Sequence, residues 1–120
     1  ILGMDPQTGA LWVNAQIPNN SVVQFHLRDA STSAYDLERA LTHYSSSTLS
    51  APPSGALLFS CAGRGYDLYG QPDHDSNAFR RLVADVPIGG FFGNGEIGPV
   101  QNSTYLHGYT SAFAVFSERK

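Results

Sequence analysis

A chain of 120 residues is long enough to form one domain with a hydrophobic core of its own, without disulfides or a metal. Its seven basic and ten acidic residues give a formal net charge of −3 and form no basic stripe, which argues against nucleic acid as a partner. No apolar run approaches the roughly 20 residues that a membrane-spanning helix requires. Charged residues make up only 14% of the chain, so we expect another domain or a second copy, as in a homodimer, to cover part of its surface.

The compartment and the extent of the chain are also suggested by the sequence. Cys61 is the single cysteine, which argues against a disulfide framework and fits a reducing compartment. Residue Ile1 begins within an apolar pattern, with no charged segment of the kind that opens a signal peptide. We therefore expect a cytoplasmic location and interpret residues 1–120 as one domain cut from a longer chain.

The N-terminal part predicts two strands. Apolar and polar residues alternate from Leu11 to Ile17 and again from Val23 to Arg28, with a turn-forming segment at residues 18–21. An alternating pattern is typical of a strand with one buried face. These two segments therefore predict an antiparallel hairpin.

A helix is predicted over residues 32–44. Apolar side chains recur at helical spacing from Ala34 to Tyr44, and Ser33 with Asp36 resembles a capping box. The serine- and proline-rich segment that follows cannot continue a helix and is expected to form a surface loop.

The segment Ala56–Cys61 is apolar without alternation, as in a strand covered on both faces, so we expect it at the centre of the sheet. A second helix is expected to begin at Asp73 or Asp75 and to end near Val83. The glycine-rich stretch Ile88–Val100 predicts a strand, a sharp turn at Asn94-Gly95 and a second extended piece. Residues 106–116 predict one long last strand.

The predicted order of elements is β-β-α-β-α-β-β. This order indicates an α+β domain with an antiparallel or mixed sheet of about five strands and two helices packed on one face.

Most of the residues whose side chains could bind a ligand or take part in catalysis lie in three loops: residues 60–65, 93–96 and 106–110. If they converge, they bring together a cation, a carboxylate, an imidazole and a thiol, and Phe59 would help to wall the site. A mostly apolar cleft with a few oriented polar groups is the usual small-molecule site. The candidate ligand-binding residues are Ser60, Cys61, Arg64, Gly65, Phe91, Asn94, Gly95, Glu96, His107, Tyr109 and Thr110.

Each candidate residue allows more than one interpretation. Arg64 and Glu96 could come together to hold a carboxylate and an ammonium group of one ligand, or they could form only a structural ion pair. Gly95 is expected to need a positive φ in its turn. No metal site is predicted, because Asp73-His74-Asp75 lacks zinc or calcium ligand spacing.

Three classes of function remain open from these residues. The first is a non-catalytic module that binds a small ligand. The second is a thiol enzyme with Cys61 as nucleophile and His107 as base, which requires contact between them. The third is a pure interaction module, which predicts no pocket between the glycine-rich loops.

Three motifs occur in a fixed order along the chain: Phe59-Ser60-Cys61-Ala62-Gly63-Arg64, then Gly90–Pro99, then His107-Gly108-Tyr109-Thr110. Together they resemble the C-terminal half of the FIST domain, a family named for F-box and intracellular signal-transduction proteins. The resemblance covers roughly residues 9–116. The third motif departs from the family's common His-Asn-x-Thr, because Gly108 stands where the family has an amide.

This resemblance implies an intracellular sensory module that binds a small ligand, with amino acids or their derivatives as proposed ligands. It also implies a FIST N half and a signalling output domain as partners within a longer protein. Some members of the family bind haem, so the resemblance leaves the cofactor of this chain open.

Overall fold

The computed structural model describes residues 1–48, 51–100 and 102–118. Its elements are β1 (Gly3–Met4), β2 (Leu11–Trp12), α1 (Ala30–His43) followed by one turn of π-helix (Tyr44–Thr48), β3 (Pro53–Cys61), α2 (Tyr66–Tyr69), α3 (His74–Leu82), β4 (Ile88–Gly93), β5 (Glu96–Val100), β6 (Ser103–His107) and β7 (Ser111–Ser117).

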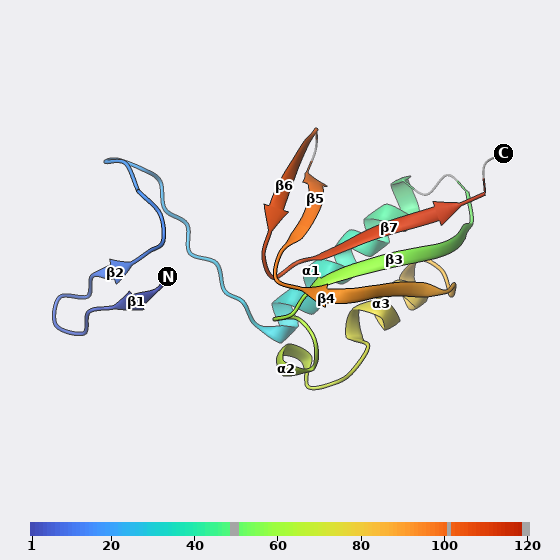
Figure 1. Cartoon of the computed structure of the whole chain (residues 1–120), viewed down its shortest axis with the longest axis horizontal. Coiled ribbons are helices and arrows are strands. Elements are labelled where there is room, and N and C mark those ends of the chain that lie inside the picture. Colours follow the sequence, from blue (N-terminus) through green and yellow to red (C-terminus); the bar gives the residue numbers. More distant parts are fainter. Residues whose placement is uncertain (49–50, 101, 119–120) are drawn as a thin grey trace.

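The main sheet has three strands, with β3 between β4 and β7 (Figure 1). β4 runs parallel to β3, with Phe59 opposite Phe91, whereas β7 runs antiparallel, with Leu58 opposite Phe113. The sheet is therefore mixed. The central position that the apolar sequence of β3 predicts is confirmed.

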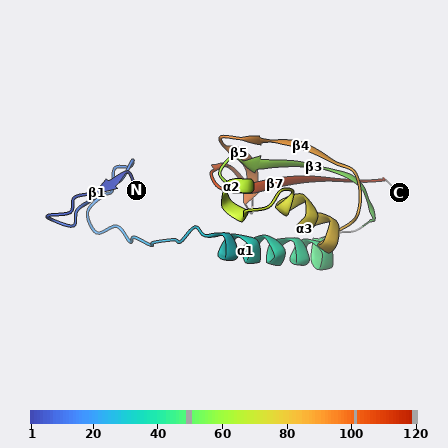
Figure 2. The ribbon, with the colours of Figure 1, turned by 90° about the horizontal axis from the view of Figure 1, so that it is seen from below.

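Helices α1 and α3 cover one face of this sheet (Figure 2). The buried core there consists of Leu41 from α1, Ala56 from β3, and Ala78 and Phe79 from α3. The fully buried ring of Phe79 stacks on Phe113 of β7, with centroids 5.3 Å apart. These contacts fix α3 on the sheet.

No described helix covers the opposite face of the sheet (Figure 2). Phe59 and Phe91 meet edge to face there, with centroids 5.1 Å apart, and Phe91 remains 66% exposed. Phe116, which is paired with Gly55 in the register of β3 and β7, is also exposed. The sequence of β3 predicts cover on both faces, and within the described residues only one face receives it.

The N-terminal hairpin that the sequence predicts is not formed. Only Leu11–Trp12 is a strand, and it pairs with Gly3–Met4, while residues 13–29 lie outside any strand and extend away from the sheet (Figure 1). Apolar side chains such as Phe25 and Leu27 are exposed along this arm. A two-stranded hairpin is marginal in water unless its apolar face packs against something. Among the described residues, the arm meets the rest of the domain through Arg28, which donates to the Gly63 carbonyl and lies over the Tyr109 ring, while Phe25 and Leu27 stay exposed.

The first helix begins two residues before the predicted start. Its N-cap is Asp29, whose carboxylate accepts hydrogen bonds from the backbone N–H and the hydroxyl of Thr32. These bonds, together with one from Ser31, lower the pKa of Asp29 to about 2. The proposed capping box at Ser33 is therefore wrong, and this leaves the Ser33 hydroxyl available for other contacts.

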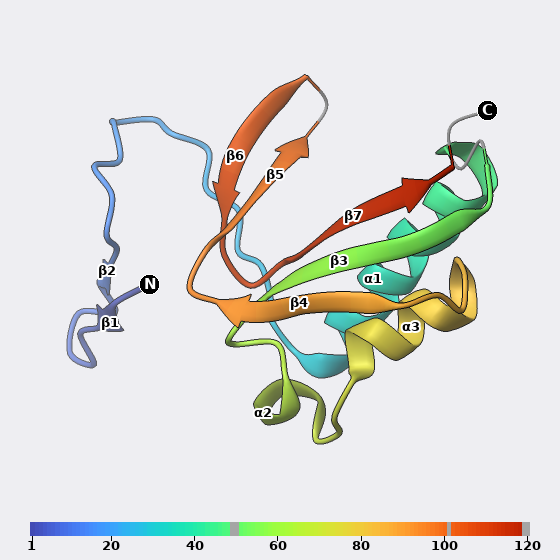
Figure 3. The same cartoon turned by 45° about the vertical axis from the view of Figure 1, so that its right-hand side comes forward.

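The long last strand predicted over residues 106–116 is divided in two by a turn at residues 108–110. β6 pairs with β5 in a separate antiparallel hairpin that rises from the end of the main sheet (Figure 3). Tyr109 in the turn has φ +59°, which few non-glycine residues adopt. The α+β class and the second helix are confirmed, whereas α2 and the extra strands raise the count beyond the prediction.

Two glycines of the Ile88–Val100 stretch have backbone angles that disfavour side chains. The positive φ expected at Gly95 is confirmed at +142°. Gly90 has φ +153°, and a Cβ there would lie 1.8 Å from the carbonyl oxygen of Leu58 on the paired strand. By contrast, a Cβ on Gly89 would meet only the Leu57 side chain, at an ordinary 3.6 Å.

None of the described helices is both long and apolar enough to cross a membrane.

The two neighbouring glycines generate a matched prediction. Gly90→Ala should lower the free energy of unfolding by more than about 2 kcal/mol, because the methyl group would separate β4 from β3. Gly89→Ala should change it by less than about 1 kcal/mol. Urea denaturation of both variants measures the difference, and equal stability of the two would contradict this account.

Candidate ligand-binding site

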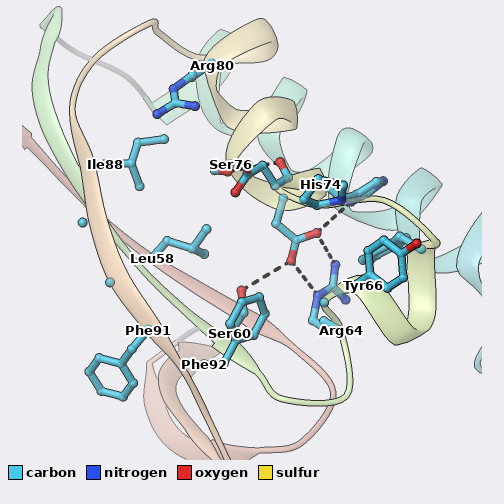
Figure 4. Close-up of a pocket in the computed structure, with 17 residues that line it drawn as sticks. Leu58, Ser60, Arg64, Tyr66, His74, Ser76, Arg80, Ile88, Phe91 and Phe92 are labelled. Atoms are coloured by element: carbon cyan, nitrogen blue, oxygen red, sulfur yellow. Dashed lines mark hydrogen bonds and ion pairs between the residues drawn. The ribbon is translucent and has the colours of Figure 1, made fainter.

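A cavity of about 520 Å³ lies at the carboxyl end of β3, between β4, α2 and α3 (Figure 4). Its size falls within the range of roughly 300–1,000 Å³ typical of small-molecule sites. Leu58 and Ile88 form an apolar floor. Phe92 and Tyr66 stand at the mouth, with 61% and 66% of their surfaces exposed.

A buried ion pair forms the inner wall of the cavity. The Arg64 guanidinium donates from Nε to Asp75 Oδ2 at 2.8 Å and from Nη2 to Asp75 Oδ1 at 3.2 Å. Both side chains are more than nine-tenths buried. This two-point geometry is specific to arginine and a carboxylate and fixes the position of both groups.

The Asp75 carboxylate has further donors around it. Ser111 of β7 donates to Oδ2, and the imidazole Nδ1 of His74 lies 2.9 Å from Oδ1. Burial by itself raises the pKa of Asp75, but the hydrogen bonds from Arg64, Ser111 and His74 outweigh it and hold this pKa below its ordinary value. Asp75 is therefore an ionised carboxylate at neutral pH.

The remaining N–H groups of Arg64 also bind within the chain. Nη1 donates to the Ser33 hydroxyl at 2.9 Å and to the Tyr109 carbonyl at 3.3 Å. Burial lowers the pKa of Arg64, but the bonds to Asp75 more than reverse this and keep the group charged. Arg64 thus joins α1, α3 and the turn before β7.

The sequence suggested that Arg64 and Glu96 come together, but the structure does not pair them. Glu96 Oε2 instead accepts from the backbone N–H of Thr110 at 3.3 Å and from its hydroxyl at 3.0 Å. Glu96 is 97% buried, and its Oε1 has no hydrogen-bond partner among the described residues. Its observed role is to hold the turn that contains Tyr109.

The three loops converge only in part. Ser60, Arg64 and Gly65 line the cavity, and Phe91 borders it from the edge strand β4, with its ring packed against Phe59 on the uncovered face. Tyr109 and Thr110 line a separate groove of about 670 Å³ along α1. The candidates that line neither the cavity nor the groove are Cys61, Asn94, Gly95, Glu96 and His107.

The catalytic pair considered from the sequence has other contacts. Cys61 is buried at the end of β3, and its backbone N–H donates to the Thr110 carbonyl. His107 Nε2 lies 3.0 Å from the Gly98 carbonyl. The base that the thiol mechanism requires is thus engaged with backbone on another sheet.

Among the cavity residues that sequence reasoning missed are Tyr69, His74, Asp75 and Arg80. The rings of Tyr69 and His74 stack in parallel with centroids 3.6 Å apart. Asp73-His74-Asp75 attracted notice as a weak metal motif and as a helix start. The signal that could have identified His74 and Asp75 as cavity residues is a carboxylate and an imidazole in the first turn of a helix that faces a central strand.

Metal binding finds no support in the described part of the chain. It contains no group of three or more His, Cys, Asp or Glu side chains that could hold an ion. His74 is the single imidazole among the described residues lining the cavity, and one of its nitrogens is engaged by Asp75.

The ion pair predicts a large cost for removing one partner. Asp75→Asn should lower the free energy of unfolding by about 3–5 kcal/mol, because Arg64 would remain buried without its carboxylate. Asp36→Asn is the control, since Asp36 forms an exposed ion pair with Arg39. That change should cost no more than about 1 kcal/mol. Urea denaturation at pH 7 tests both, and similar costs would refute a structural role for the pair.

The lowered pKa of Asp75 also predicts a pH dependence. Its stabilising contribution is complete above its ordinary pKa of 3.8 and is lost as the pH falls through the lower pKa of the folded state. The wild-type protein should therefore lose stability below about pH 4, and Asp75→Asn should lose less over the same range. Unfolding free energies measured from pH 7 down to pH 2.5 test this.

Comparison with known proteins agrees with the motifs. Residues 1–99 match the model of the FIST C domain. An uncharacterized protein of Mycobacterium tuberculosis is 41% identical over 116 residues, which is 97% of this chain and 30% of that protein. An uncharacterized protein of Mycobacterium bovis is 38% identical over the same shares. Human F-box only protein 22 is 33% identical over 75 residues, or 49% of this chain and 19% of its own length. The chain thus spans about a third of the length of the mycobacterial relatives.

Proposed function

Because this chain belongs to the FIST C domain family, a family associated with signal transduction, we propose that it is a sensory module that binds a small organic ligand without catalysis. The single observation that carries the proposal is the cavity of about 520 Å³ beside the Arg64–Asp75 ion pair. A rigid polar wall next to an open apolar floor is suited to binding, because it loses little entropy when a ligand arrives.

Two contacts favour binding over thiol catalysis. The Cys61 thiol is buried, and nucleophilic cysteines need an accessible, activated thiolate. His107 has its Nε2 directed at the Gly98 carbonyl. The cavity between the first glycine-rich loop and β4 likewise favours a ligand-binding module over one that only docks on a partner.

The proposal includes a partner within a longer, cytoplasmic signalling protein. The uncovered face of the main sheet and the arm at residues 13–29 both expose apolar side chains. The mycobacterial relatives are about three times as long as the match. We assign the cover of these surfaces to the FIST N half, and the response to a ligand to an attached output domain. A homodimer would use the same surfaces.

The ligand proposal is tested with Phe92→Ala. A panel of metabolites that includes the amino acids should contain compounds that raise the melting temperature of the wild type. Their affinity for Phe92→Ala should fall by about tenfold, because the aromatic wall at the mouth is lost. The matched control is Phe116→Ala, an exposed phenylalanine of β7 on the uncovered face. Equal affinity of both variants would place the ligand elsewhere.

A further inference from the structure

The polar groups deepest in the cavity are already occupied by one another. Arg64 binds Asp75, Ser33 and Tyr109, so its charge is balanced by the carboxylate beside it. The Ser60 and Ser111 hydroxyls lie 2.7 Å apart and both contact Asp75. This inner wall is therefore nearly neutral and has little hydrogen-bonding capacity left for a charged ligand.

Among the residues that the structure describes, Arg80 is the cation that remains available at the cavity. It lies one helical turn beyond Ser76 on α3, and both residues line the cavity (Figure 4). Its side chain is 43% exposed, and its nearest charge, Asp85, is 3.8 Å away and 89% exposed. Such an exposed pair contributes little, so the guanidinium is free to exchange it for a better-placed anion.

The cavity floor beside Arg80 is apolar. Ile88 and Leu58 form the floor, and the exposed ring of Phe92 lies farther along β4. Gly89 and Gly90 leave this edge of the cavity without side chains between Ile88 and the two phenylalanines. A flat apolar body can lie along such a surface and stack on an aromatic ring.

Negative charge is present at the opposite end. Asp73, the N-cap residue of α3, lines the cavity and is exposed, about two helical turns from Arg80. A second anionic group at that end would be repelled. On these grounds, and resting on the proposed function, we infer that the cavity takes a flat, apolar monoanion whose acid group binds Arg80 and whose body lies over Leu58, Ile88 and Phe92.

The test compares two probes that differ only in charge, 1-naphthylacetate and 1-naphthylacetamide. Titrations followed by amide and arginine side-chain NMR signals locate each probe at Gly89, Gly90 and Arg80. The wild type should bind the carboxylate about tenfold more tightly than the carboxamide, because a charged hydrogen bond is gained.

Arg80→Gln should abolish this preference by weakening the carboxylate alone. The matched control is Arg81→Gln, which removes the same charge from the next residue of α3. Arg81 pairs with Glu38 of α1 and does not line the cavity, so the preference should survive.

The outcomes separate the two proposals. Equal binding of both probes at Gly89 and Gly90 would overturn the monoanion class and leave the ligand-binding function standing. A preference that persists in Arg80→Gln would overturn the role of Arg80. If neither probe perturbs the cavity signals, or if shifts are confined to the arm, both this inference and the use of the cavity are refuted.

Discussion

The buried ion pair between Arg64 and Asp75 determines how the parts of this domain meet. Two charges so far from water are costly unless each has several hydrogen-bond partners, and here the donors and acceptors come from four elements or loops. The loop after β3, the first turn of α3, the Ser33 region of α1 and the turn before β7 must all be in place together. The pair therefore acts as a positional constraint more than as a source of net stability.

This constraint explains why the residues that fix the cavity wall differ from those exposed at its rim. A guanidinium that already has a carboxylate and two oxygen partners is a poor anchor for a second carboxylate. Its value lies in fixing the Asp75 carboxylate, which in turn orients His74, and the His74 ring stacks on Tyr69 of α2. Under the proposed function, recognition of a ligand falls to side chains at the rim, where exposure is greater and sequence change costs less stability.

The sequence predicts the parts of the fold that depend on local patterns. The apolar run of β3 and the helical spacing of α1 are such patterns, because burial of one face leaves a periodic pattern and burial of both faces leaves a continuous apolar run. The choice of Asp75 as partner of Arg64 leaves none, and the sequence instead suggested that Arg64 comes together with Glu96. The prediction of an N-terminal hairpin was wrong for a related reason. The alternation of apolar and polar residues there indicates a strand face buried against another surface, and the described residues do not supply that surface.

Strand β4 links the cavity to the uncovered face of the sheet. Consecutive side chains of a strand point to opposite sides. Phe92 accordingly stands at the cavity mouth, against the backbone of Gly65, while Phe91 meets Phe59 on the uncovered face. Within the described residues, β4 is an edge strand held on one side, by β3, so it has fewer constraints than the centre of the sheet. Under the proposed function, a ligand that orders Phe92 would act on the same backbone that presents Phe91, so β4 would connect the cavity to the uncovered face of the sheet.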